Sequence, residues 1–277
     1  MDINGKVAVI TGGSRGIGKA IAVMLSTKGA KVAVNYSSGA DSAERVVKEI
    51  EGMGGTAIKV KADVTKQSEV QSMFQTVLKH FGRVDILVNN AGTMGQPKFL
   101  EISEEDWDRV MAVNLKGMFN CCQAVIPIFL KESGGKIINM SSIAGKMGGA
   151  SGVQYAASKA GVIGLTMALS TEFAKKNIYV NAITPGPVRT EMFQNLPPSL
   201  QERFAETTHV GRVCEPSEIA HGVVFLLEND FMAGETLNMS AGRYMDYHRG
   251  WVVLGRSKPE TSTCRERLRT AEPYKGH

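Results

Sequence analysis

Seven short apolar runs, separated by segments with helical spacing, constrain the fold of this chain more than any other feature. Each run is rich in valine and isoleucine and is closed by Gly, Asn, Asp or Ser, which is typical of a buried strand that ends at a turn. The runs occupy residues 6–10, 31–36, 57–64, 84–92, 136–142, 178–186 and 236–242. Because strands that alternate with helices pair in parallel through right-handed crossovers, the pattern predicts a doubly wound α/β fold with a seven-stranded parallel sheet of the Rossmann type.

The segments between the runs predict six helices. In one of them Val70, Phe74 and Val77 recur at helical spacing and form an apolar stripe. The six segments occupy residues 18–29, 42–54, 68–82, 103–133, 154–177 and 215–230. Residues 187–212 interrupt the alternation, and a long connection in a compact domain is often a functional lid. We therefore expect a single doubly wound domain over residues 1–246.

A basic tail follows this domain over residues 247–277. Residues 243–277 carry a net charge of +4, which leaves +1 for residues 1–242. The nearly neutral body has no basic stripe, so we expect no binding of nucleic acid. Two interpretations of the tail stay open: a poorly ordered or non-native extension, or an arm over a cleft that is anchored by Trp251, Val252, Val253 and Leu254.

Other features of the composition bear on the class of protein. Asp2 and the turn-like Asn4–Gly5 stand where a signal peptide would have a basic region and an apolar region. No apolar run approaches the roughly 20 residues that span a bilayer, so we expect no membrane segment.

The cysteines have no CxxC spacing, which indicates reduced thiols in a cytoplasmic protein. No cluster of His, Cys and acidic residues suggests a metal site.

The motif TGGSRGIG occupies residues 11–18, at the first strand-to-helix junction. Gly12 can turn out of the strand, Gly16 lets the backbone approach a ligand, and Gly18 lets the helix pack closely. The N-terminus of the following helix offers unpaired N–H groups and about half a positive charge, which favours a pyrophosphate. The motif therefore predicts a dinucleotide site, and the alternative is a tight turn without a ligand.

The spacing Gly-x-x-x-Gly-x-Gly resembles that of the short-chain dehydrogenase/reductase family. Further motifs of this family follow: ADV at 62–64, NNAG at 89–92, Asn114, SS at 141–142, YAASK at 155–159 and PGPVRTEM at 185–192. The segments VGRVCEPSEIA and GETLNMSAG resemble the bacterial 3-oxoacyl-[acyl-carrier-protein] reductase branch. The resemblance covers residues 4–244 and implies an NAD(P)-dependent oxidoreductase. Ala241 departs from it, because the family pattern has glycine there.

The resemblance also implies the contacts of the cofactor. Asp63 and Val64 would meet the adenine, and residues 90–92 would pass behind the adenosine ribose. Val188 and Thr190 would hold the nicotinamide carboxamide. The expected cofactor contacts are Gly12, Ser14, Arg15, Gly16, Ile17, Gly18, Asn35, Asp63, Val64, Asn90, Ala91, Gly92, Tyr155, Lys159, Pro185, Gly186, Val188 and Thr190.

The end of the second predicted strand bears on the choice of cofactor. An acidic residue there would bind the ribose hydroxyls of NAD(H) and repel a 2′-phosphate. Neutral Asn35 stands near that position, and Arg15 in the glycine loop can pair with a phosphate. These two residues favour NADP(H), and NAD(H) stays an alternative.

Tyr155 and Lys159 are four residues apart on a predicted helix, so they share one face. A phenol has a pKa of about 10, and a nearby ammonium lowers it, which would make Tyr155 a usable general acid and base. Ser142 precedes Tyr155 by thirteen residues, the family spacing, and is preferred to Ser141 as the hydroxyl that binds the substrate oxygen. The resemblance implies that Asn114 bends its helix and holds a water that links Lys159 to solvent.

The predicted catalytic set is thus Asn114, Ser142, Tyr155 and Lys159. The leading function is NADPH-dependent reduction of a 3-oxoacyl-type carbonyl to a secondary alcohol. The alternatives are a secondary-alcohol dehydrogenase that acts on a steroid, a polyol or another ketone, and a non-catalytic nucleotide-sensing protein.

The expected partners follow from the same features. The ligand is a small carbonyl or alcohol, and a carrier-protein-linked substrate would need a basic patch beside the cleft. Candidates for such a patch are Lys131, Lys136, Lys175 and Lys176. The apolar helix over 106–131 and the small-residue face of 154–176 predict burial against another subunit, and the resemblance implies a homotetramer.

Overall fold

The computed structural model describes residues 1–95, 98–149, 151–195 and 197–245. Its seven strands form one parallel sheet in the spatial order β3-β2-β1-β4-β5-β6-β7. The strands are β1 Val7–Ile10, β2 Lys31–Tyr36, β3 Thr56–Lys61, β4 Ile86–Asn89, β5 Gly135–Met140, β6 Ile178–Pro185 and β7 Thr236–Met239. The predicted doubly wound sheet is confirmed. Its strand order reverses between β1 and β4, which places the expected ligand crevice at their carboxyl ends.

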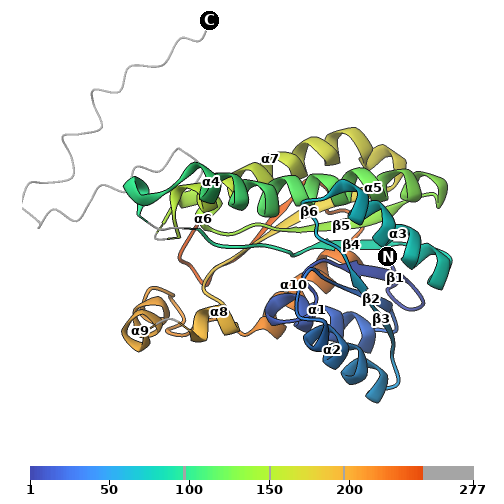
Figure 1. The fold of residues 1–277 in the computed structure, drawn as a ribbon, viewed down its shortest axis with the longest axis horizontal. Coiled ribbons are helices and arrows are strands. Elements are labelled where there is room, and N and C mark those ends of the chain that lie inside the picture. The colour runs from blue at the N-terminus through green and yellow to red at the C-terminus, as the bar shows by residue number, and fades with distance from the viewer. Residues whose placement is uncertain (96–97, 150, 196, 246–277) are drawn as a thin grey trace, which may run out of the picture. The chain divides into compact units, whose positions relative to one another are not determined.

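Helices cover both faces of the sheet, with α1, α2 and α10 on one face and α3, α5 and α7 on the other (Figure 1). The helices are α1 Gly16–Thr27, α2 Ala40–Gly52, α3 Gln67–Phe81, α4 Glu104–Met111, α5 Gly117–Lys131, α6 Ala144–Met147, α7 Val153–Phe173, α8 Glu191–Gln194, α9 Pro198–Glu206 and α10 Pro216–Glu228. Residues Met1–Met245 form one compact unit. The tail over 247–277, with the arm considered at 251–254, lies outside the described residues.

Two apolar cores lie against the two faces of the sheet. Neighbouring residues of a strand point to opposite faces. Ala8 and Ile10 of β1 accordingly pack with α1 and α10, whereas Val7 and Val9 pack with α3 and α5. Because strands covered on both faces leave no open face for a ligand, the chemistry has to be at the ends of the strands.

The segment expected as one helix over 103–133 has an irregular middle. It consists of α4, a π-helical stretch Ala112–Lys116 and α5. Asn114 lies within the π-helical stretch and is fully buried. The lid segment 187–212 also has more structure than expected, because it contains α8 and α9.

One helical run in the described part of the chain, Glu104–Lys131, is long and apolar enough by length and composition to cross a membrane. The sequence had led us to expect no run of this length. Half of its most apolar stretch is buried inside the fold. There Cys121, Val125 and Phe129 belong to the core between the sheet and helices α3 and α5. We therefore interpret the run as a core helix.

The Asp85 carboxylate connects several residues at the amino-terminal edge of the sheet. Its carboxylate is almost fully buried and accepts hydrogen bonds from the Val7 amide at 3.0 Å and from Arg83 Nε at 2.8 Å. Lys6 Nζ lies 3.6 Å from the other carboxylate oxygen. A buried charge needs such partners, so this carboxylate and its donors depend on one another.

We expect Asp85→Ala to lower the free energy of unfolding by about 3 kcal/mol, because the Val7 amide and the Arg83 guanidinium both lose their acceptor. Urea denaturation measures the loss. Asp108→Ala, at an exposed position of α4, is the matched control and should change the free energy by less than about 0.5 kcal/mol. Equal losses in the two variants would contradict the role given to Asp85.

Candidate active site

The glycine loop joins β1 to α1 in a conformation that only glycine takes without strain. Gly12 and Gly16 have φ values of 61° and 53°. A Cβ atom at Gly18 would lie 2.3 Å from the carbonyl oxygen of Gly12. Helix α1 has Arg15 at its N-cap, no side-chain cap and no acidic residue in its first turn, so its N-terminal amides fit an anion such as a pyrophosphate. Two further residues expected at the cofactor are half-buried in this loop: Ser14 and Ile17.

Asn90 holds this loop from the end of β4. Its side-chain Nδ2 donates to the carbonyl oxygens of Thr11 and Gly12 at 3.0 and 3.1 Å. The backbone amides of Asn90 and Ala91 donate to the Thr11 hydroxyl at 2.9 and 3.0 Å. The residues expected behind the adenosine ribose therefore lie beside the glycine loop, and Asn90 positions that loop through its side chain.

Asn35 is placed differently from our expectation. Its side chain is 2% exposed and points into the protein. Its Oδ1 accepts from the Gly12 amide at 3.3 Å, and its Nδ2 donates to the carbonyl oxygens of Val60 and Ala62 at 3.3 and 3.1 Å. A side chain occupied in this way positions the loop, and the direct cofactor contact expected for Asn35 is not supported.

The residues that follow Asn35 include no acidic side chain before Asp41, as the sequence indicates. Tyr36 is half-buried, and residues 37–40 are exposed. No acidic residue stands among them, and Arg15 in the glycine loop is also exposed. The charge at this end of the crevice therefore still suits a 2′-phosphate. Because β2 is covered on both faces, strand alternation alone does not distinguish a buried Asn35 from an exposed one.

The turn after β3 is fixed by its own polar groups. The Asp63 carboxylate accepts from the amide and the hydroxyl of Thr65 at 3.0 and 2.8 Å. The Asp63 amide donates to Glu69 at 2.8 Å. Val64 is buried, and its carbonyl accepts from Asn120 at 2.9 Å. Asp63 and Val64 thus lie at the carboxyl end of the sheet, where an adenine contact is expected.

Ser142, Tyr155 and Lys159 meet at the carboxyl end of β5. The Ser142 hydroxyl hydrogen-bonds the Tyr155 side chain, and Lys159 Nζ lies 5.6 Å from the centre of the Tyr155 ring. Lys159 Nζ also donates to the Met140 carbonyl at 2.8 Å. The Ser141 hydroxyl is buried and donates to the Lys159 carbonyl at 2.8 Å. The structure therefore favours Ser142 over Ser141 as the hydroxyl beside the phenol.

The pKa shifts of this pair differ from the expected ones. Burial raises the pKa of Tyr155, and the hydrogen bond from Ser142 opposes this only in part. Burial also lowers the pKa of Lys159 to about 8. We had expected Lys159 to lower the pKa of the phenol, but in the chain alone desolvation dominates, and Ser142 rather than Lys159 opposes it. The phenol is consequently held in its protonated form.

Asn114 clamps the loop that follows β4. Its Oδ1 accepts from the Thr93 amide at 2.7 Å, and its Nδ2 donates to the Thr93 carbonyl at 2.9 Å and to the Ser158 hydroxyl at 3.1 Å. A Cβ at Gly92 would lie 3.4 Å from Asn114 Oδ1 and 3.7 Å from Lys159 Nζ. Asn114 therefore connects the β4 loop to the catalytic turn of α7, and its predicted water link stays a prediction.

The loop after β6 lies across the crevice from the glycine loop. The Pro185 carbonyl accepts from the Ile143 amide at 3.2 Å, and the Gly186 amide donates to the Met239 carbonyl at 2.9 Å. Val188 is buried. The Thr190 methyl lies 3.3 Å from the place of a Cβ at Gly16. The two loops expected to hold the two ends of a dinucleotide are therefore neighbours.

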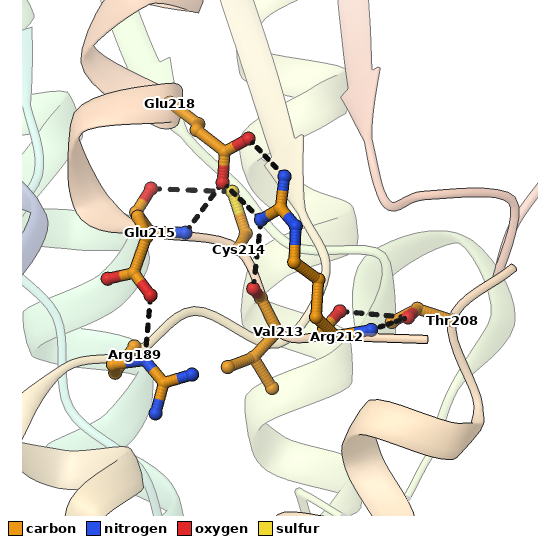
Figure 2. Close-up of polar contacts among 7 residues, drawn as sticks. All are labelled: Arg189, Thr208, Arg212, Val213, Cys214, Glu215 and Glu218. Atoms are coloured by element: carbon orange, nitrogen blue, oxygen red, sulfur yellow. Dashed lines mark hydrogen bonds and ion pairs between the residues drawn. The ribbon is translucent and has the colours of Figure 1, made fainter. Parts of the chain in front are cut away.

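Two ion pairs hold the lid to the start of α10, and the sequence analysis did not foresee them (Figure 2). Arg189 Nε lies 2.7 Å from Glu215 Oε1, and both terminal nitrogens of Arg212 lie 2.7 Å from the Glu218 carboxylate. Arg212 lowers the pKa of Glu218 to about 2. The Arg189 amide also donates to the Cys214 carbonyl at 2.8 Å. Val188 and Thr190 therefore flank Arg189, whose backbone amide and side chain are both bonded to the segment that precedes α10.

One lysine of the expected basic patch is not available. Lys136 is 1% exposed, and its Nζ lies 2.6 Å from Asp230. The other three lysines, Lys131, Lys175 and Lys176, are exposed. No group of three or more His, Cys, Asp or Glu side chains that could hold a metal ion is found in the described ranges.

Comparisons with known proteins agree with this arrangement. Residues 6–201 match the family described as short chain dehydrogenase. The chain is 42% identical over 242 residues to a 3-oxoacyl-[acyl-carrier-protein] reductase FabG of Staphylococcus epidermidis, covering 87% of this chain and 99% of that protein. It is 40% identical over 246 residues to a 3-oxoacyl-[acyl-carrier-protein] reductase of Synechocystis sp., covering 88% and 98%. It is 38% identical over 244 residues to a FabG of Thermotoga maritima, covering 87% and 99%.

We expect Gly18→Ala to weaken NADPH binding by about tenfold or more, because the new methyl group would displace the backbone of Gly12. Fluorescence titration with NADPH measures the dissociation constant. Gly52→Ala at the end of α2 is the matched control, since a Cβ there meets no atom within 4 Å. An unchanged affinity in a folded Gly18→Ala protein would contradict the role of the glycine loop.

Proposed function

The chain belongs to the short-chain dehydrogenase family, and from that premise we propose that it is an NADPH-dependent reductase of 3-oxoacyl thioesters. Family membership makes it an NAD(P)-dependent oxidoreductase. The observation that carries the finer proposal is the contact of Ser142 and Tyr155 beside Lys159, whose Nζ would lie 3.7 Å from a Cβ at Gly92 in the β4 loop. Support for the substrate class comes from the names of the three relatives.

The fit of the site to a dinucleotide rests on the left-handed glycines of the loop and the uncapped N-terminus of α1. The loops at Gly12–Gly18, Asp63–Val64, Asn90–Gly92 and Pro185–Thr190 would hold the cofactor, and a bound NADPH would supply the hydride that the carbonyl carbon accepts. Exposed Arg15 and the absence of an acid at residues 36–40 support a preference for NADP(H).

The proton chemistry follows from the shifted pKa values. Tyr155 is protonated at neutral pH because burial raises its pKa, so it can donate a proton to the oxygen of the reduced carbonyl. The Ser142 hydroxyl is placed to bind the same oxygen. Lys159, with a pKa of about 8, is charged at neutral pH and stabilises the phenolate that remains.

We also propose a homotetramer that acts in a reducing cytoplasm. Phe119 and Leu130 of α5 and Met167 of α7 are large apolar side chains left exposed, which supports burial against another copy. The described cysteines Cys121 and Cys122 carry free, buried thiols, which supports a reducing compartment.

The substrate proposal is tested by following NADPH oxidation with an acetoacetyl thioester beside cyclic ketones, steroids and polyol-derived ketones. We expect the thioester to give the highest kcat/KM and NADH to be the poorer cofactor. Tyr155→Phe should lower kcat by about 10²- to 10⁴-fold, because the general acid is lost. Tyr179→Phe, at the opposite edge of the sheet, is the control and should keep its activity. Faster turnover of a ketone would favour the alcohol dehydrogenase alternative.

A pH profile tests the role of Lys159. Burial lowers its pKa to about 8, so its charge is present below that pH and is lost above it. We therefore expect kcat/KM for carbonyl reduction to be level near pH 7 and to fall above about pH 8. Lys159→Arg keeps its charge, so the decline should move to higher pH in this variant. A level wild-type profile up to about pH 10 would contradict this role.

A further inference from the structure

Two cations lie over aromatic rings beside the lid. Arg243 Cζ lies 5.5 Å from the centre of the Phe204 ring in α9. Lys146 Nζ, in α6, lies 5.0 Å from the centre of the Tyr244 ring. These four residues, which we call the cationic rim, come from three separate segments of the chain. Figure 1 places α6, α8 and α9 at one end of the fold, where the carboxyl ends of β5 and β6 lead into them.

One side of the cationic rim is tied to the catalytic serine. Lys146 follows Ser142 by four residues, and the Ser142 hydroxyl accepts from the Ala144 amide at 3.1 Å. In this way α6 is fixed directly to the residue that faces Tyr155. Gly145 in the same helix packs so closely on α7 that a Cβ would lie 2.6 Å from the Lys159 backbone. Lys146 is therefore carried by a short helix packed against the catalytic turn.

The other side of the cationic rim is tied to the lid and to β6. The Phe204 ring lies 6.0 Å from the ring of Phe193 in α8, the helix that Thr190 caps. The Arg243 amide donates to the Ser240 carbonyl at 3.2 Å, and a Cβ at Gly186 would lie 3.1 Å from Ser240 Cα. The segments that carry Arg243 and Phe204 thus border the loop expected to hold the nicotinamide.

The charge of Arg243 is not neutralised by the described part of the chain. No carboxylate lies within ion-pair distance of it among the described residues, and burial alone lowers its pKa. Arg189 and Arg212, near the two ends of the lid segment 187–212, differ because each is paired with a glutamate (Figure 2). An aromatic ring attracts a cation but does not replace a counter-ion. A half-buried guanidinium in this situation is suited to pair with an anion.

We propose that Arg243 binds a phosphate group carried by the thioester arm of the substrate. This inference rests on the proposed reduction of a thioester and adds a binding subsite to it. Guanidinium groups match the geometry of phosphate oxygens, and the site lies at the lid rather than at the reacting atoms. The subsite would select thioesters with a phosphorylated arm over neutral ketones of similar size.

Two substrates that differ only in this phosphate test the proposal: acetoacetyl-4′-phosphopantetheine and acetoacetyl-pantetheine. We expect the wild-type protein to have the lower KM for the phosphorylated thioester. Arg243→Gln should raise that KM by about tenfold, with kcat nearly unchanged, and should leave the KM of the neutral thioester within about twofold. Arg203→Gln, an exposed arginine of α9, is the matched control and should change neither KM.

Salt supplies a second readout, because added salt should raise only the KM of the phosphorylated thioester. The proposal is overturned if Arg243→Gln changes both KM values equally, since Arg243 would then act only on the position of the lid. It is also overturned if the wild-type protein does not distinguish the two thioesters.

Calorimetric binding of 4′-phosphopantetheine to the protein loaded with NADP⁺ separates this inference from the proposed function. If the wild-type protein binds this compound but not pantetheine, and Arg243→Gln loses the binding, the phosphate subsite stands even when neither thioester is reduced. If the thioesters are reduced but 4′-phosphopantetheine binds no better than pantetheine, the subsite is rejected and the proposed function is retained.

Discussion

The carboxyl edge of a sheet covered on both faces is the constraint on which this structure depends. Strands such as β1 and β4 are buried throughout, so their side chains are used in the two cores. Polar groups can reach a ligand there from the loops that leave the strands and from helices that pack beside those loops. The glycine loop, the β4 loop and the turn with Ser142 all leave that one edge, and each contacts polar side chains of a neighbouring strand, loop or helix.

Carboxamides make most of these connections. Asn35 and Asn90 hold the glycine loop from two sides, and Asn114 holds the β4 loop against α7. A carboxamide donates and accepts at once and carries no charge, so it can link two backbones inside the protein without the cost of burying an ion. The loops that would surround a dinucleotide are therefore positioned by residues that need not touch it.

The sequence predicts the sheet, the glycine loop and the choice of Ser142, because each depends on a spacing along one segment. The sequence does not predict features that depend on the direction in which a side chain points or on the residues that surround it. Asn35 lies in a strand covered on both faces, so its polarity alone did not reveal that it points inward. Lys136 looked like a surface lysine, but it lies in β5, and the segment after α10 covers it with Asn229 and Asp230. The π-helical stretch around Asn114 likewise reflects contacts with Thr93 and Ser158.

The failure of the expected pKa shift at Tyr155 clarifies the direction of proton flow. In water a lysine ammonium, with a pKa of 10.5, is a weaker acid than a tyrosine phenol, with a pKa of 10.0. Burial opposes charge on both groups, so it raises the pKa of Tyr155 and lowers that of Lys159 to about 8. The order of acidity is thereby reversed. If Tyr155 gives up its proton, transfer of a proton from the Lys159 ammonium to the phenolate is then favourable in free energy, because the ammonium is the stronger acid. In the reaction that we propose, the same desolvation would keep Tyr155 protonated before the transfer and would favour its reprotonation afterwards.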